Sequence, residues 1–122
     1  MATFPVFKAA IVHAAPVFLE LAATIEKACA LVAEAARNGA RLVAFPETFI
    51  PAFPVWSALR SPIYNHDLFC RLAANSLRVP GAELDRVCAA ARKSGVIVSL
   101  GINERAESSL GCIYNSNVLI GE

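Results

Sequence analysis

Apolar residues gather along the chain in short runs and in helical repeats, which predicts alternating strands and helices. Runs at 7–13, 42–45, 96–102 and 112–120 predict strands, and the wholly apolar run at 42–45 is typical of a strand buried on both faces of a mainly parallel sheet. Apolar positions at steps of three and four predict helices over 17–38, 67–76 and 82–94. The pattern therefore indicates an α/β fold of about four strands and three helices.

The helix ends carry recognisable signals. Pro16 can serve as the first helical residue, where its missing N–H costs nothing. Gly39 and Gly95 follow the long helices and are expected to be left-handed C-caps. Leu31 falls on the polar face of the first helix, which suggests that this helix is covered on its outer side too. A strand, a helix and a strand joined by short connections form a βαβ unit with a right-handed crossover.

Polar side chains follow three of the predicted strands. His13 ends the first strand, Glu47 follows the second, and Asn103 and Glu104 are expected just past the third. The carboxyl ends of parallel strands lie on one edge of the sheet, where open α/β sheets bind ligands. This edge is therefore the expected functional site.

Glu47 lies in an unusual setting, the stretch LVAFPETFIPAFPVW from Leu42 to Trp56. Pro46 cannot donate to the sheet ladder and should end the strand, which leaves Glu47 as a lone acid in a stiff apolar loop. Desolvation there disfavours the charged form and should raise the pKa of Glu47, as a general base requires. The alternative is that Glu47 caps the loop by accepting backbone N–H bonds.

Size and composition limit the class of protein. The 122 residues suggest one domain over 1–122, and 57% hydrophobic residues with 17% charged suggest surfaces that another part of the protein or a partner covers. Eleven basic and ten acidic residues give a net charge of +1, so nucleic acid and anionic membrane are not expected partners. No apolar run reaches the roughly 18 to 20 residues of a membrane span, and the start MATFP lacks the basic residues of a signal peptide, so a cytoplasmic location is expected.

Signals for several other chemistries are missing. The sequence has no glycine-rich phosphate loop, no G-x-S-x-G elbow and no C-x-x-C pair, and its two histidines, His13 and His66, do not have zinc-ligand spacing. We therefore expect no metal and no cofactor. His66 is expected to be a solvated residue near a helix start. Four cysteines are expected to be reduced, mostly buried thiols rather than catalytic residues: Cys29, Cys70, Cys88 and Cys112. Cys112 fits this expectation least well, because it follows Gly111 at a predicted strand start.

Several segments resemble one known family. In this chain, FPETFIPAFPVW is similar to the glutamate-bearing segment of the nitrilases, within the carbon–nitrogen hydrolase superfamily. The N-terminal strand, helix and strand of that family resemble KAAIVHAAPVFLELAATIEKACALVAEAARNGARLVAFPE, and its following segments resemble NSLRVPG, GVIVSLGINER and YNS. The resemblance covers essentially the whole chain, in order.

The resemblance implies a four-layer αββα sandwich, here only its N-terminal portion, and a catalytic Glu, Lys and Cys. In such enzymes the thiol attacks the carbon of a nitrile, ammonia leaves, and water hydrolyses the thioester to a carboxylic acid. Glu47 matches the general base, and Phe53 and Trp56 lie where the family's loop lines the substrate pocket; packing of these two rings against the core is the alternative. The implied partners are a small nitrile or amide and, for a full-length enzyme, further copies in a homo-oligomer.

The chain departs from the family pattern at two places. His13 stands where relatives commonly carry Gln. The sequence also ends before the family's Lys and Cys motifs, and no lysine follows Lys93. We therefore expect the N-terminal part of a nitrilase, inactive alone because a catalytic set that has lost members loses many orders of magnitude in rate. Half of a two-sheet sandwich would also expose the inner face of its sheet.

Three other functions stay open at this point. An amidase or carbamoylase of the same superfamily uses the same three catalytic residue types. A non-catalytic oligomerisation or interaction module is the alternative from another class. A small-molecule binder that uses the surroundings of Glu47 is the third.

Overall fold

The computed structural model describes residues 3–109 and 111–121, which form one four-stranded sheet with helices on one face. The strands are β1 (Ala9–Ile11), β2 (Leu42–Ala44), β3 (Ile97–Arg105) and β4 (Ile113–Ile120), in the order β1-β2-β3-β4. The first three run parallel and β4 is antiparallel to β3. The predicted α/β class and four strands are confirmed.

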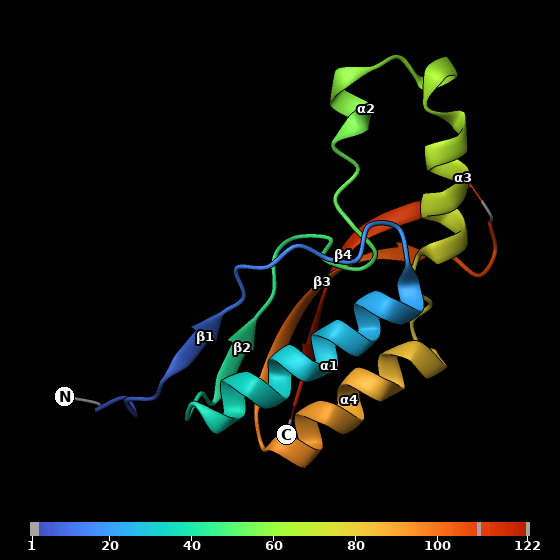
Figure 1. Cartoon of the computed structure of the whole chain (residues 1–122). Coiled ribbons are helices and arrows are strands. Elements are labelled where there is room, and N and C mark those ends of the chain that lie inside the picture. The colour runs from blue at the N-terminus through green and yellow to red at the C-terminus, as the bar shows by residue number, and fades with distance from the viewer. Residues whose placement is uncertain (1–2, 110, 122) are drawn as a thin grey trace.

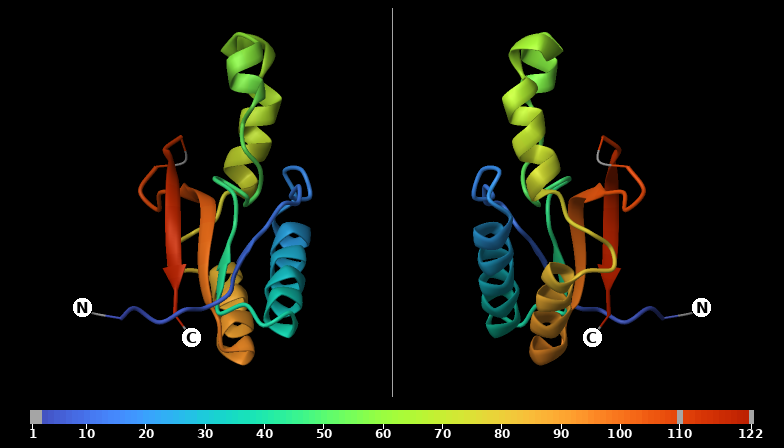
Figure 2. Two further views of the ribbon diagram at one scale, coloured as in Figure 1. Left: turned by 90° about the vertical axis from the view of Figure 1, so that its left-hand side faces the viewer. Right: turned by 90° about the vertical axis from the view of Figure 1, so that its right-hand side faces the viewer.

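Two long helices, α1 (Leu21–Arg37) and α4 (Ala82–Ser94), lie side by side and cover one face of the sheet (Figures 1 and 2). Their apolar faces and the sheet form the main core, because each buries the side chains that its periodicity places inward. Fully buried members include Ile25, Val32, Val43, Val87, Val98, Leu100 and Ile102. Gly39 and Gly95 follow these helices with φ of 83° and 62°, which confirms both predicted left-handed caps.

The start of α1 is later than predicted. The helix begins at Leu21, and Pro16 is not its first residue. Leu19 has a positive φ of 54° and its side chain is fully buried in a second cluster with Ala52, Trp56 and Leu72. Burial of this leucine therefore outweighs continuation of the helical repeat. The first strand is likewise shorter than the predicted 7–13.

Asn103 and Glu104 were expected beyond the third strand, and this is wrong. Both lie inside β3, which continues to Arg105 because its pairing with β4 extends that far, with Arg105 opposite Ile113. The sequence pattern could not show this extension, since it depends on a partner strand later in the chain.

The segment between β2 and α4 contains more helix than expected. The predicted helix at 67–76 is α3 (His66–Asn75), and it is preceded by the short α2 (Trp56–Leu59) and the 3-10 helix η1 (Pro62–Tyr64). Together α2 and α3 project beyond the end of the sheet (Figure 1). None of the helices in the described part of the chain is long and apolar enough to cross a membrane.

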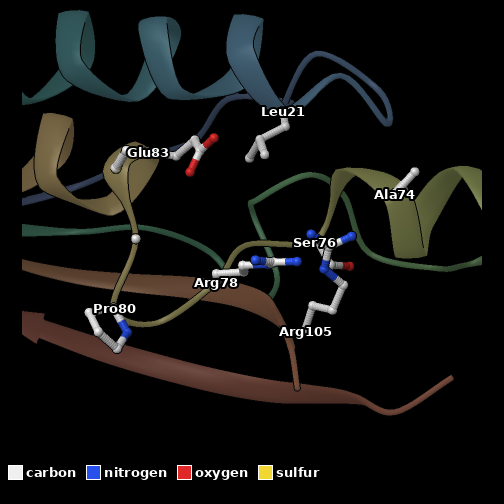
Figure 3. Close-up of a pocket in the computed structure, with 9 residues that line it drawn as sticks. Leu21, Ala74, Ser76, Arg78, Pro80, Glu83 and Arg105 are labelled. Carbon is white, nitrogen blue, oxygen red and sulfur yellow. The ribbon is translucent and has the colours of Figure 1, made fainter. Parts of the chain in front are cut away.

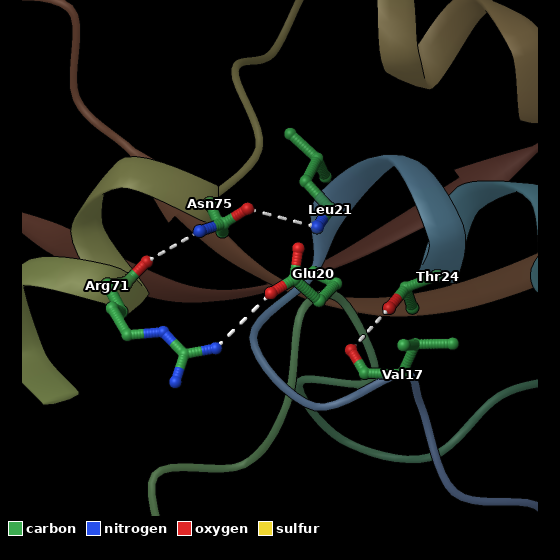
Figure 4. Close-up of polar contacts among 6 residues, drawn as sticks. All are labelled: Val17, Glu20, Leu21, Thr24, Arg71 and Asn75. Carbon is green, nitrogen blue, oxygen red and sulfur yellow. Dashed lines mark hydrogen bonds and ion pairs between the residues drawn. The ribbon is translucent and has the colours of Figure 1, made fainter.

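A polar contact ties α3 to the start of α1 (Figure 4). The N-cap residue of α1, Glu20, makes no side-chain capping hydrogen bond. The backbone N–H of Leu21 donates instead to Asn75 Oδ1, 3.1 Å away. Arg71 forms an ion pair with Glu20 at 3.2 Å, and Thr24 Oγ1 donates to the Val17 carbonyl at 2.9 Å. The end of α3 is therefore fixed relative to α1 and the sheet.

The second face of the sheet is not covered by any helix of the described chain (Figure 2). Alternate positions of β3 divide accordingly: Val98 and Leu100 are fully buried, whereas Ile97 on the other face is 45% exposed. Ile11 of β1 and Leu119 of β4 lie on the same face, in one cross-strand row, and are 84% and 75% exposed. The structure therefore has one helical layer and one sheet, with an apolar open face.

Candidate active site

The turn that follows β2 carries Glu47 to the carboxyl end of the parallel strands, as predicted. Beyond β2 the chain stays hydrogen-bonded to β3. Phe45 N–H donates to the Ser99 carbonyl at 2.8 Å, and Ile50 N–H donates to the Gly101 carbonyl at 3.3 Å. Residues 46–49 make a turn between these two anchors. Glu47 is therefore held against β3 from both sides.

Gly101 is required for this close approach. A Cβ at Gly101 would lie 2.3 Å from the Pro46 carbonyl oxygen, 2.7 Å from Thr48 N and 2.9 Å from Glu47 Cα. These atoms belong to backbone and cannot swing aside as a flexible side chain would. The turn rests on β3 at the one position that has no side chain.

Thr48 has a backbone conformation that a β-branched residue seldom adopts, with φ of 44°. Its side chain is 2% exposed, and Oγ1 has no hydrogen-bond partner among the described residues. A buried unsatisfied hydroxyl and a left-handed backbone both cost free energy, so the fold holds this turn in place at a cost in stability.

A cavity of about 460 Å³ adjoins the turn, and we call it the Glu47 cavity. Asn103 lines it and holds the loop that follows the turn, because its Nδ2 donates to the Ala52 carbonyl at 2.8 Å and its backbone N–H donates to the Ile50 carbonyl at 2.7 Å. The lining residues come from the turn, the following loop, α3, β3 and β4: Glu47, Thr48, Phe53, Pro54, Phe69, Leu72, Asn103, Gly111, Ile113 and Asn115. The cavity combines one carboxylate with two amides and a largely apolar wall.

The surroundings of the Glu47 carboxylate differ from the prediction. The side chain is exposed in the described structure rather than enclosed by apolar groups, so these residues do not supply the predicted desolvation. It also does not cap the loop by accepting backbone N–H bonds, since its one hydrogen bond among the described residues comes from Asn115 Nδ2, 2.5 Å from Oε1. The carboxylate is thus oriented by a side chain of β4.

The other predicted site residues are divided between this cavity and elsewhere. Phe53 lines the Glu47 cavity, but Trp56 is not among the lining residues and packs in the second cluster with Leu19, so the packing alternative describes Trp56. His13 is exposed and lines a separate hollow beside α1. Glu104 accepts a hydrogen bond from Ser116 instead of facing the cavity.

Asn115, Phe69 and Leu72 line the cavity, and sequence reasoning did not select them as site residues. Asn115 belongs to the YNS segment that carried part of the family resemblance, which was the available signal. Phe69 and Leu72 lie on the apolar face of α3, a feature that sequence alone assigns to the core. Only the position of α3 beyond the sheet brings them to Glu47.

A second cavity of about 450 Å³ lies between the start of α4, α3 and β3 (Figure 3). Arg78, Arg105 and Glu83 line it, and Arg105 Nη1 donates to the Ala73 carbonyl at 3.5 Å. Ser76 also lines it, and its hydroxyl donates to the Leu72 carbonyl at 2.7 Å. This cavity lacks the pairing of an oriented acid with an apolar wall, so the Glu47 cavity is the better candidate.

The cysteines are free thiols, but they are less buried than expected. Cys29, Cys88 and Cys112 are half-buried and Cys70 is exposed. Burial raises the pKa of the Cys29 thiol above its ordinary value of 9.0, opposed by the nearby Arg86 guanidinium. Cys70 Sγ lies 3.5 Å from His66 Nε2 on the exposed surface of α3. Neither a cysteine nor a lysine is among the described residues that line the Glu47 cavity, and the described part of the chain shows no cluster of three metal-ligating side chains.

Comparisons with known proteins agree on one family. The family model described as carbon–nitrogen hydrolase matches residues 8–122. An arylacetonitrilase of Hypocrea virens is 50% identical over 116 residues, which are 95% of this chain and 34% of the relative. A nitrilase of Bacillus sp. strain OxB-1 is 38% identical over 90% of this chain and 32% of the relative, and an aliphatic nitrilase of Rhodococcus rhodochrous is 43% identical over 85% of this chain and 29% of the relative. The chain spans about a third of the length of the curated relatives it matches.

Proposed function

The chain belongs to the carbon–nitrogen hydrolase family, and on that premise we propose that it supplies the general base of a nitrilase. The reaction converts a nitrile and two waters to a carboxylic acid and ammonia. Glu47 takes the proton of a cysteine thiol, the sulfur attacks the nitrile carbon, ammonia leaves after the first water adds, and the second water hydrolyses the thioester. The observation that carries this proposal is the position of Glu47, at the carboxyl end of β2 and at the lip of a cavity with an aromatic wall.

The chain's own residues perform a limited part of this chemistry. Glu47 accepts and returns a proton, and the apolar side chains of Phe53, Phe69 and Ile113 form a surface against which a substrate can exclude water. The thiol and the lysine are assigned to sequence outside this chain, because neither lines the cavity among the described residues. We therefore propose that the isolated chain does not hydrolyse nitriles.

The family match alone leaves an amidase or carbamoylase open. The three relatives compared above are named an arylacetonitrilase, a nitrilase and an aliphatic nitrilase, which supports a nitrile substrate. Among nitriles we propose an arylacetonitrile, because the relative with 50% identity carries that name and two phenyl rings, Phe53 and Phe69, line the Glu47 cavity. The cytoplasmic location and the homo-oligomer stay predictions from the sequence.

A fused enzyme tests this proposal. The whole 122-residue chain is joined to the part of the Hypocrea virens arylacetonitrilase that lies beyond the matched segment, and ammonia release is measured for the fusion and for the isolated chain. We expect release from phenylacetonitrile by the fusion, slower release from phenylacetamide, and none by the isolated chain. Faster release from the amide would favour the amidase alternative, and a defined oligomer with no release by the fusion would favour the non-catalytic module.

The aromatic wall is tested in the same fusion. Phe69→Ala should lower kcat/KM for phenylacetonitrile by about 10-fold or more, and for a short aliphatic nitrile by less, because even one missing methylene in an apolar substrate pocket is worth about 1–3 kcal/mol. Phe4→Ala is the matched control, since Phe4 is 85% exposed and does not line the cavity. Equal losses for both nitriles would remove the support for an aryl substrate.

A further inference from the structure

The hydrogen bond between Asn115 and Glu47 joins residues 68 positions apart in the sequence. Asn115 Nδ2 donates to Glu47 Oε1 at 2.5 Å, and among the described residues no other side chain bonds to this carboxylate. Both residues line the Glu47 cavity. The contact therefore lies within the site rather than beside it.

Both ends of this contact are fixed by backbone. Asn115 lies on β4 directly opposite Asn103 of β3, and Asn103 in turn holds the loop at Ile50 and Ala52. Glu47 is held by the turn that rests on Gly101, two residues before Asn103 on the same strand. One strand, β3, thus sets the positions of the donor and of the acceptor.

The chemistry of an amide suits this place. A general base must present one oxygen to the group it deprotonates, and a carboxylate that is free to rotate does so only part of the time. An amide N–H carries no charge and can donate to Oε1 both while the carboxylate is ionised and after Oε2 takes a proton, with the stronger bond to the ionised form. An ammonium or guanidinium group in its place would add a full positive charge and favour the ionised carboxylate much more strongly.

We propose that Asn115 is the positioning residue of Glu47: it holds Oε1 and leaves Oε2 to take the proton of the attacking thiol. This inference rests on the proposed function. It assigns to Asn115, within the YNS segment of β4, a part in positioning the general base, acting through Glu47 and not on the substrate.

The neighbouring residue provides a matched control. Ser116 Oγ donates to Glu104 Oε2 at 2.5 Å, so Asn115 and Ser116 each hold one carboxylate from consecutive positions of β4. Neither Ser116 nor Glu104 lines the Glu47 cavity. Removing either hydrogen bond perturbs β4 similarly, but only one of them reaches the general base.

The experiment measures kcat and KM of the fused enzyme with phenylacetonitrile. Asn115→Ala should lower kcat about 10- to 100-fold, the range for a misplaced catalytic group, with KM changed by less than about threefold. Asn115→Asp keeps the shape, loses the donor and adds a second carboxylate, so its kcat should fall at least as far. Ser116→Ala should stay within about twofold of the native fusion.

A second measurement does not depend on catalysis. In the 122-residue chain, the side-chain amide resonances of Asn115, identified by their loss in Asn115→Ala, should move in Glu47→Gln and stay in place in Ser116→Ala. Unmoved resonances in Glu47→Gln would overturn the contact, and so would an Asn115→Ala fusion with the kcat of the Ser116→Ala fusion.

The two proposals fail in different ways. A native fusion that releases no ammonia, or a Glu47→Gln fusion as active as the native one, contradicts the proposed function, and the positioning role falls with it. An active native fusion, an inactive Glu47→Gln fusion and an unimpaired Asn115→Ala fusion contradict the positioning role alone.

Discussion

Two residues, Gly101 and Thr48, determine where the backbone of Glu47 lies. Gly101 provides the space in which the Pro46–Thr48 turn lies, and Thr48 turns the chain with a positive φ of 44° although it is β-branched. Strain of this kind persists only where the surrounding structure enforces it, and it concentrates at functional sites. The turn is therefore best understood as the element that fixes where Glu47 leaves the sheet.

Gly101→Ala should destabilise the 122-residue chain by about 1–3 kcal/mol, because the new Cβ meets backbone at 2.3 Å and forces the turn off β3. Urea unfolding measures the change. Gly111→Ala is the control: apart from its chain neighbours, no described atom lies within 4 Å of the Cβ it would add, so its effect should stay within about 0.5 kcal/mol. Equal effects of the two substitutions would mean that the close approach does not exist in solution.

The cysteines should differ in reactivity. Because burial raises the pKa of Cys29, iodoacetamide at pH 8 should alkylate it at least about threefold more slowly than the exposed Cys70, and its rate should rise only at higher pH. The same shift means that the folded chain keeps a proton that the unfolded chain loses, so Cys29 should lower stability as pH rises above about 9.0. Mass spectrometry of tryptic peptides follows the alkylation; faster labelling of Cys29 would contradict its burial.

At this scale the sequence predicted the place of Glu47 but not its surroundings. Pro46 is adjacent in the chain, and a strand-ending proline is a local signal. Contacts with Gly101 and Asn115 depend on which strands pair, which no local pattern states. Trp56 shows the same limit, since it packs in a cluster with Leu19 and Leu72 and is not among the residues that line the cavity.

Among the secondary-structure elements, α3 is the helix that helps to shape the Glu47 cavity. It contributes Phe69 and Leu72 to the wall and is fixed by Asn75, which accepts the first N–H of α1. When a side chain on one helix accepts the first N–H of another helix, the positions of the two helices are coupled. The wall of the site therefore depends on a hydrogen bond at the far end of α3.

Asn75→Ala should cost about 0.5–2 kcal/mol of unfolding free energy, the usual value of a lost N-terminal cap. Arg71→Ala removes the adjacent ion pair with Glu20, whose side chains are 50% and 59% exposed, and should cost less, within about 0–1 kcal/mol. Urea unfolding of both variants gives the order. A larger loss for Arg71→Ala would show that the ion pair, and not the amide, joins the two helices.

Periodicity was sufficient for the bodies of the helices and failed at one end. The left-handed glycines after α1 and α4 were predicted because a helix that stops at glycine is a local event. The start of α1 was not, because Leu19 leaves the helical path to be buried beside Trp56. The short α2 and η1 lie in the proline-containing segment, where no helical repeat is long enough to detect.

At the scale of the whole molecule, the open face of the sheet stands out. Ile11, Ile97 and Leu119 are exposed on it, while the opposite face is buried under α1 and α4. The expectation of an uncovered apolar surface came from composition and from the half sandwich that the resemblance implied, and the structure assigns that surface to one face of the sheet. A second sheet packed there would give the sandwich that the resemblance implied.

The isolated chain should therefore self-associate through this face. Leu119→Lys should shift it toward monomer in sedimentation experiments, because a charge in the middle of an apolar contact is costly to bury. Leu59→Lys is matched in side chain and in exposure, 75% in both cases, but lies on α2, and it should change association little. A native chain that remains monomeric at high concentration would show that the open face does not drive association.

The proposed chemistry depends most on Glu47 as the general base, and one measurement tests this role directly. In the fused enzyme, Glu47→Gln should lower kcat for ammonia release from phenylacetonitrile by about 1,000-fold or more, since members of a catalytic set act together. Glu104→Gln, whose carboxylate bonds Ser116 outside the cavity, should stay within about threefold of the native fusion. Ammonia release by the Glu47→Gln fusion at the rate of the Glu104→Gln fusion would contradict the account.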